Sequence, residues 1–147
     1  MNLTKNFTLE ELTVTDHREF KNEPNPTETE NLKRIASLLE QVKGVLGGVP
    51  IMVNSAFRSK QVNDAVGSKD TSQHRVGCAA DIRVPGMAPD AVVKAVIAAK
   101  LPFDQLIREF AKPNGGGWTH ISVPNTMGAK PRGQVLIIDA SGTRPYA

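Results

Sequence analysis

The spacing of apolar residues predicts one long helix in the first third of the chain. Between Leu32 and Val42 the apolar positions recur at three- and four-residue intervals, the pattern of an amphipathic helix. We expect Thr27 to cap this helix and Gly44 to end it. Two prolines stand near the end of the preceding residues, 1–26, so we expect there an N-terminal arm with a short helix, part of the same domain.

Short apolar runs farther along the chain predict strands. Five runs have the length and the flanking turn residues of strands: residues 49–55, 78–84, 103–110, 118–123 and 134–139. The third and fourth flank a glycine-rich loop and predict an antiparallel hairpin. Further helical turns are expected at 61–66 and 88–100. Because the strands cluster late in the chain, we predict an α+β single domain, a small and mostly antiparallel sheet with helices packed on it.

Composition places the chain among ordinary globular proteins. Hydrophobic residues make up 39% and charged residues 22% of its 147 residues, which excludes disordered, collagen-like and coiled-coil chains. No apolar run approaches the roughly 20 residues of a membrane span, and the N-terminus lacks the apolar stretch of a signal peptide. The formal charge of +3 comes without a lysine or arginine block, and aromatic residues are few. We therefore expect no nucleic-acid partner and no stable membrane association.

An aspartate stands in the middle of the strand predicted at 78–84. Asp81 lies between an alanine and an isoleucine, where strand propensity disfavours it. A carboxylate buried there requires a cation or several hydrogen-bond donors. One solution is an ion pair with an arginine such as Arg58 or Arg83. Another involves His74, which precedes Asp81 across a glycine turn.

The predicted hairpin carries a second pair of candidate groups. Its most apolar face consists of Leu106, Phe110, Ile121 and Val123. If that face is buried, strand alternation places Glu109 and His120 together on the other face. A slip of one residue in register would separate them. The alternatives are a half-buried histidine bonded to a neighbour and a solvated glutamate.

Two histidines and one aspartate suffice to hold a catalytic zinc ion, so His74, Asp81 and His120 are candidate ligands. Such a site keeps three protein ligands and leaves a fourth position for water, whose pKa the metal lowers. A nearby carboxylate can accept a proton from that water and pass it to a leaving amine. Glu109 is the best-placed candidate for this role.

The candidate residues fall into an ordered set of motifs. In chain order these are Ser72-x-His74, Gly77, Ala79, Asp81 and Trp118-x-His120. The set resembles the zinc D-Ala-D-Ala carboxypeptidases and the related L-alanyl-D-glutamate endopeptidases of bacteria and phages. Segments around Phe7, Arg58 and Asn63 resemble the same family, so the resemblance runs from about residue 6 to residue 123.

The resemblance implies a fold, a cofactor and a set of roles. The fold would be the hedgehog/DD-peptidase fold, with residues 27–147 as the catalytic domain. One Zn²⁺ per chain would be held by His74, Asp81 and His120. The substrate would contact Arg58, Ser72, Gln73 and Trp118. Arg58 would hold a substrate carboxylate or polarise its carbonyl, whereas Trp118 has core packing as an equal alternative.

One position departs from the family pattern. Many members carry the catalytic acid three residues before the last histidine, where this chain has Gly117. The resemblance then leaves Glu109 as the proton carrier, with Asp104 as a weaker candidate whose alternative is a turn residue. Outside the motifs, we expect His17 on the surface and Cys78, on the strand face opposite the ligands, in the core.

The resemblance implies a peptidase that hydrolyses amide bonds in the stem peptides of peptidoglycan, as a carboxypeptidase or an endopeptidase. Small size and the lack of a signal peptide favour a monomeric phage or prophage endolysin. It would stay in the host cytoplasm until a holin-type lesion releases it to the cell wall. The glycine at the acid position motivates an alternative, a non-catalytic metal-binding module of the same fold for wall attachment or phage structure. A nucleic-acid binder is the least supported class.

Overall fold

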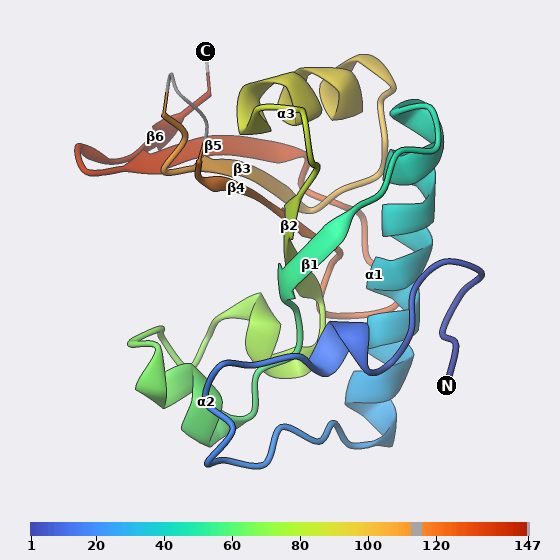
Figure 1. The fold of residues 1–147 in the computed structure, drawn as a ribbon, viewed down its shortest axis with the longest axis vertical. Coiled ribbons are helices and arrows are strands. Elements are labelled where there is room, and N and C mark those ends of the chain that lie inside the picture. The colour runs from blue at the N-terminus through green and yellow to red at the C-terminus, as the bar shows by residue number, and fades with distance from the viewer. Residues whose placement is uncertain (113–115, 147) are drawn as a thin grey trace.

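The computed structural model in Figure 1 describes residues 1–112 and 116–146 and has an α+β architecture, which confirms the predicted class. Its helices are α1 (Pro26–Val45), α2 (Lys60–Ala65) and α3 (Pro89–Ala98), with 3₁₀ turns η1 (Glu11–Thr13) and η2 (Gln73–Val76). Its strands are β1 (Met52–Ser55), β2 (Ala79–Arg83), β3 (Gln105–Glu109), β4 (Trp118–Ser122), β5 (Gln134–Asp139) and β6 (Gly142–Pro145). None of the described helices has both the length and the hydropathy needed to span a membrane.

The long helix α1 begins two residues earlier than predicted. Asn25, not Thr27, is its N-cap: the Asn25 side chain accepts a hydrogen bond from the Glu28 amide at 2.7 Å, and the Glu28 carboxylate accepts one from the Asn25 amide at 2.9 Å. The Thr27 prediction was wrong because Pro26 itself occupies the first helical position, which moves the N-cap back to Asn25. A proline is tolerated at the first helical position, where its missing N–H would have no partner.

The six strands form one sheet in the order β1-β2-β4-β3-β5-β6. Among the described strands the β3–β5 pairing alone is parallel, and β3 and β4 form the predicted antiparallel hairpin. Strand β6 was not expected, because its sequence lacks an apolar alternation; in the structure its residues are all exposed. In Figure 1, α1 runs along one side of the sheet, α3 lies across the top, and α2 lies at the lower left.

The hydrophobic core lies between the helices α1 and α3 and one face of the sheet. Leu32 and Ile35 of α1 join Ile82, Leu106 and Ile121 of the sheet in this core, each at most 1% exposed. Residues of the N-terminal arm also enter it, including Phe7 at 1% and Leu12 at 0% exposure. The division of the chain at residue 26 stays a prediction. The opposite face of the sheet is free to carry polar groups.

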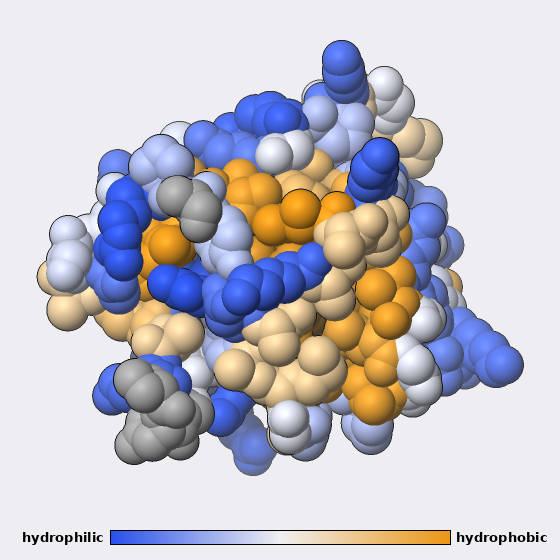
Figure 2. Space-filling model, turned by 90° about the horizontal axis from the view of Figure 1, so that it is seen from above, coloured by the Kyte–Doolittle hydropathy of each residue, from blue (hydrophilic) through white to orange (hydrophobic). Residues whose placement is uncertain are grey.

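One apolar residue does not lie where the hairpin pattern predicts it. Phe110 was expected in the buried face of the hairpin, but it is 41% exposed. It follows the end of β3 with a left-handed φ of +52°, which turns its side chain away from the core. The upper end of the molecule is also incompletely covered. Figure 2 shows apolar side chains gathered in the middle of this face within a hydrophilic border. Val45 at the end of α1 and Ile97 in α3 are 39% and 38% exposed.

Candidate metal centre

His74 is held by a tight turn packed against α1. Within η2, the Ser72 hydroxyl accepts a hydrogen bond from the His74 amide at 3.2 Å. The turn ends at Gly77, whose φ is +79° and whose added Cβ would lie 2.7 Å from the carbonyl oxygen of Glu28. Only glycine fits this close approach. The backbone around His74 is therefore fixed by packing as well as by its own hydrogen bonds.

The imidazole of His74 presents one defined nitrogen to the site. Its Nδ1 lies 2.6 Å from the backbone carbonyl of Ala56, and since a carbonyl only accepts, Nδ1 carries the proton. The lone pair of Nε2 then faces Asp81, with Nε2 3.4 Å from Asp81 Oδ1. A carbonyl that fixes the tautomer of a histidine in this way is the usual support of a metal ligand.

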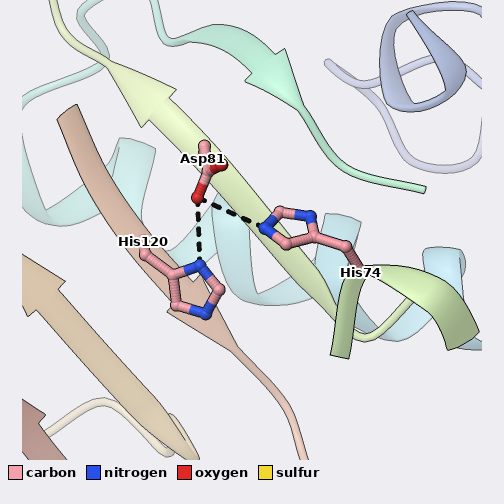
Figure 3. Close-up of side chains that lie close together, drawn as sticks. All are labelled: His74, Asp81 and His120. Carbon is pink, nitrogen blue, oxygen red and sulfur yellow. Dashed lines mark hydrogen bonds and ion pairs between the residues drawn. The ribbon is translucent and has the colours of Figure 1, made fainter. Parts of the chain in front are cut away.

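Strand register brings Asp81 and His120 together. They are directly opposite each other in the antiparallel pairing of β2 and β4. His120 Nδ1 lies 3.0 Å from Asp81 Oδ1. Figure 3 shows both imidazoles pointing at the same carboxylate, His74 from its turn and His120 from its strand. One donor atom from each of the three residues lies within 4.8 Å of the others, and all three side chains are buried.

The protonation states of this cluster suit a divalent cation. Burial lowers the pKa of His74, so the ring is neutral and able to ligate. Burial alone would raise the pKa of Asp81, yet that pKa lies below its ordinary range in this cluster. Neutral imidazole and ionised carboxylate are the forms that bind metal. Two imidazole nitrogens and one carboxylate oxygen match the donor set of catalytic zinc sites.

Arg58 adjoins the cluster, as one of the sequence alternatives proposed. Its Nη2 lies 3.4 Å from Asp81 Oδ2, while its Nε donates to the Ser55 hydroxyl at 3.1 Å. A third contact joins Arg58 Nη1 to the Asn63 amide oxygen at 3.4 Å. Asn63 is fully buried, and its own amide donates to the Lys69 carbonyl at 2.9 Å. Sequence reasoning missed the supporting roles of Ser55 and Asn63, although both lie in segments that resemble the family.

Glu109 lies on the same face as His120, in the register predicted for the hairpin. It pairs with Trp118 across β3 and β4, one step from His120, and its Oε1 is 4.0 Å from His120 Nδ1. Its side chain is 16% exposed, so it is not a solvated strand charge. Burial raises the pKa of Glu109, and the nearby charge of Asp81 adds to the effect. A carboxyl group with a raised pKa exchanges protons more readily near neutral pH.

The backbone itself requires glycine at position 117. Gly117 has a φ of +76°, and an added Cβ there would collide with the carbonyl oxygen of Glu109 and lie 2.6 Å from the amide nitrogen of Ala111. No acidic residue fits without moving the strand. The departure from the family pattern is thus built into the close approach of this segment to the end of β3.

The remaining predicted residues lie in different places. Gln73 is not brought to the metal cluster: its amide donates to the Val123 carbonyl and to Asn125 Oδ1, both at 3.0 Å. Asp104 instead pairs with Arg132, at 2.7 Å between Oδ2 and Nη2, as expected for a turn residue. Ser72 is placed beside His74 by the hydrogen bond described above.

The other residues considered in the sequence analysis are Trp118, His17 and Cys78. Trp118 lies on the face that carries the metal cluster, with its ring centroid 5.5 Å from that of Phe110. Its indole N–H is buried and has no hydrogen-bond partner among the described residues. His17 lies apart from the cluster and is 3.3 Å from Glu19. Cys78 is fully buried in the core, as predicted.

Comparison with known proteins agrees with this geometry. The family model described as Peptidase M15 matches residues 5–122, and the chain belongs to this family. A search of curated proteins found no match. Membership supports a metallopeptidase, and a peptidase of this family acts on peptidoglycan peptides. The cluster of His74, Asp81 and His120 supplies side chains that could hold the metal.

Proposed function

We propose that this protein is a zinc peptidase that hydrolyses an amide bond in the stem peptides of bacterial peptidoglycan. The bond would be of the D-Ala-D-Ala carboxypeptidase or the L-Ala-D-Glu endopeptidase type. The observation that carries the proposal is the convergence of His74, Asp81 and His120, with the carboxylate of Glu109 4.0 Å from His120 Nδ1. Three buried ligands with one carboxylate beside them form the arrangement that metal-assisted amide hydrolysis requires.

Each protein group has a definite task in this reaction. A zinc ion bound by the three side chains would polarise the scissile carbonyl and lower the pKa of a nearby water. Glu109 accepts a proton from the attacking water and returns it to the leaving amine, a role that its raised pKa favours. Arg58, half-buried and oriented by Ser55, donates to the carbonyl oxygen as negative charge develops on it. The Ala56 carbonyl keeps Nε2 of His74 unprotonated throughout.

The biological setting is part of the proposal. The motif residues resemble those of phage as well as bacterial enzymes, and we propose that the protein is a monomeric phage or prophage lysis enzyme. It would act from the host cytoplasm after another protein opens the membrane. Expression in a bacterial host tests this: lysis should require co-expression of a pore-forming protein. Lysis without such a protein would contradict this setting and leave the chemistry untouched.

The chemistry is tested on purified protein loaded with zinc and incubated with peptidoglycan. New free amines should appear, a chelator should stop their release, and added zinc should restore it. Mass spectrometry of the fragments identifies the bond. Glu109→Gln should retain zinc and lose hydrolysis, whereas Glu30→Gln, an exposed carboxylate on α1, should behave as the native protein.

Two outcomes would overturn parts of the proposal. A zinc-loaded native protein that binds the wall but releases no amine is a non-catalytic wall-attachment module of the same fold. Unchanged hydrolysis by Glu109→Gln would remove Glu109 from the mechanism and leave the zinc assignment standing.

A further inference from the structure

A pocket of about 520 Å³ opens where β2 and β4 separate. Their last paired residues are Ile82 and Thr119, after which β2 ends and the chain turns at Pro85 and Gly86 toward α3. None of the three candidate metal ligands lines this pocket. Its volume falls in the range of small-molecule binding sites, roughly 300–1,000 Å³. We call it the Arg83 pocket.

The Arg83 pocket has an apolar interior and few polar groups. Ile82 and Val92 contribute core side chains to it, and Trp118 lines it as well. Arg83 and Asn54 are the longer polar side chains among its lining residues. A mostly apolar pocket with one or two convergent polar groups is the usual form of a site that selects a ligand.

Arg83 differs from most other arginines of the chain. The arginines that lie within 4.0 Å of a carboxylate are Arg58, Arg75, Arg108, Arg132 and Arg144. Within residues 1–112 and 116–146, Arg83 has neither an ion pair nor a hydrogen bond from its guanidinium, and it is exposed. The arginine alternative for Asp81 is thus met by Arg58, and Arg83 retains its full donor set for a ligand.

Strand geometry places two lining residues of the Arg83 pocket, Arg83 and Trp118, one step from the metal cluster, whereas Ile82 and Val92 line the pocket from the core side of the sheet. Arg83 follows Asp81 by two residues on β2, and Trp118 precedes His120 by two residues on β4. Alternate residues of a strand share a face and lie about 6.6–6.8 Å apart along it. Arg83 and Trp118 therefore stand side by side with the metal ligands on the same face, displaced by one such step. An extended peptide covers this distance in about two residues.

We propose that the Arg83 pocket binds the substrate segment beside the scissile amide, and that Arg83 selects a substrate with a free carboxylate in that segment. This inference rests on the proposed function. The apolar walls take the aliphatic part of the segment, and the planar guanidinium takes its carboxylate through two parallel hydrogen bonds. Stem peptides carry carboxylates that are either free or amidated, so Arg83 distinguishes these two forms.

The test uses pairs of synthetic stem peptides that differ only in one group. In each pair one chosen carboxylate is free or is replaced by the carboxamide, and kcat/KM is measured with the zinc-loaded native protein. One pair should show a preference for the acid of roughly 10- to 100-fold, the range expected for hydrogen bonds to a charged group. Most of the difference should lie in KM, because the carboxylate is bound equally in ground and transition states.

Variants of Arg83 assign that preference to its side chain. Arg83→Gln should reduce the acid-to-amide ratio to within about twofold, by loss of activity on the acid alone, and Arg83→Lys should restore part of it. Arg18→Gln, an exposed arginine on the N-terminal arm, is the matched control and should keep the native ratio. If no pair shows a preference, or if the preference persists in Arg83→Gln, the inference is wrong.

A binding measurement separates this inference from the proposed function. The chain has a single tryptophan, Trp118, which lines the Arg83 pocket, so peptide binding there should change its fluorescence. In the non-hydrolysing Glu109→Gln protein, the acid peptide should titrate this signal at lower concentration than the amide. Loss of that difference in the double variant with Arg83→Gln supports the inference even if no peptide is cleaved. Hydrolysis with equal titration by acid and amide would overturn the inference alone.

Discussion

Two buried aspartates, Asp81 on β2 and Asp104 immediately before β3, have opposite surroundings. Asp81 and Asp104 are 7% and 4% exposed. Asp104 accepts hydrogen bonds on both oxygens from the Arg132 guanidinium, at 2.7–3.1 Å, and one from the Arg132 backbone amide at 2.9 Å. Asp81 meets its arginine only at 3.4 Å, and its other neighbours are two imidazole nitrogens.

The difference shows which buried carboxylate is structural and which can take a cation. Asp104 is satisfied by donors of its own chain, so a metal ion would have to displace a bidentate arginine. Around Asp81 the two facing imidazole nitrogens are themselves metal donors, and a cation at their centre would satisfy all three groups together. The two aspartates are similarly buried, and they differ in the groups that surround them: arginine donors around Asp104 and imidazole nitrogens around Asp81.

The strongest test of this comparison exchanges each carboxylate for its amide. Asp81→Asn should lower zinc content from one per chain toward zero and abolish hydrolysis, because the only anionic ligand is lost. Zinc affinity should fall by more than about 100-fold, since loss of a mere supporting group costs about 10- to 100-fold. Metal analysis of dialysed protein measures this directly. Asp104→Asn should keep one zinc ion per chain, and loss of zinc from both variants would break the comparison.

A second test concerns Gly117, the residue that stands at the family's usual acid position near the Asp81 cluster. Gly117→Ala should lower the free energy of unfolding by about 2–4 kcal/mol, since it adds a left-handed residue and a collision with the Glu109 carbonyl. Gly128→Ala is the control: its φ is +83°, but nothing lies within 4 Å of the added Cβ, so only about 1 kcal/mol is expected. Urea denaturation measures both. If both variants lost the same free energy of unfolding, the close approach at Gly117 would not affect stability.

A second substitution at position 117 tests hydrolysis instead of stability. Gly117→Glu should not restore hydrolysis to Glu109→Gln, because the backbone that carries residue 117 has no room for a side chain. Restored hydrolysis would show that the strand can shift and that the family's usual acid position remains usable here.

Much of the candidate site was predictable from the sequence because strand alternation constrains it. Burying Leu106 and Ile121 fixes the hairpin register, and that register brings Glu109 to the same face as His120. The structure confirms this step. The direction of Gln73 was not predictable, since a side chain in a short 3₁₀ turn follows whatever packs against it, here the segment after β4.

The fold was predictable where an apolar pattern exists and not where it is missing. The α+β class follows from the order of helical and strand-like segments. Strand β6 carries no such pattern and is specified by pairing with β5, including the Arg144–Asp139 ion pair at 2.8 Å. The Arg83 pocket also escaped prediction, because it arises where two strands part, and the sequence does not mark where hydrogen bonding between strands stops.

A third test measures what the satisfied aspartate contributes to stability. Asp104→Asn should lower the free energy of unfolding by about 1–2 kcal/mol, the cost of losing charge-assisted hydrogen bonds. A larger loss is not expected, because the Arg132 side chain is 54% exposed and its charge stays solvated. Zinc content and hydrolysis per folded molecule should be unchanged. A loss of hydrolysis at constant stability would make Asp104 part of the active site after all.

The smallest expected effect is the pH dependence of the stability that the Asp104 carboxylate contributes. The Arg132 guanidinium and backbone amide hold the pKa of Asp104 below its ordinary value in the folded chain, although burial acts in the opposite direction. The folded chain therefore binds this proton less readily than the unfolded chain, whose aspartates titrate near pH ~3.9. The contribution is complete above that pH and is lost as the pH falls from there through the folded pKa. Urea midpoints of native protein and Asp104→Asn should thus differ most at pH 7, and the difference should shrink as the pH falls below ~3.9. A constant difference over this range would mean that the carboxylate charge of Asp104 is not what the arginine stabilises.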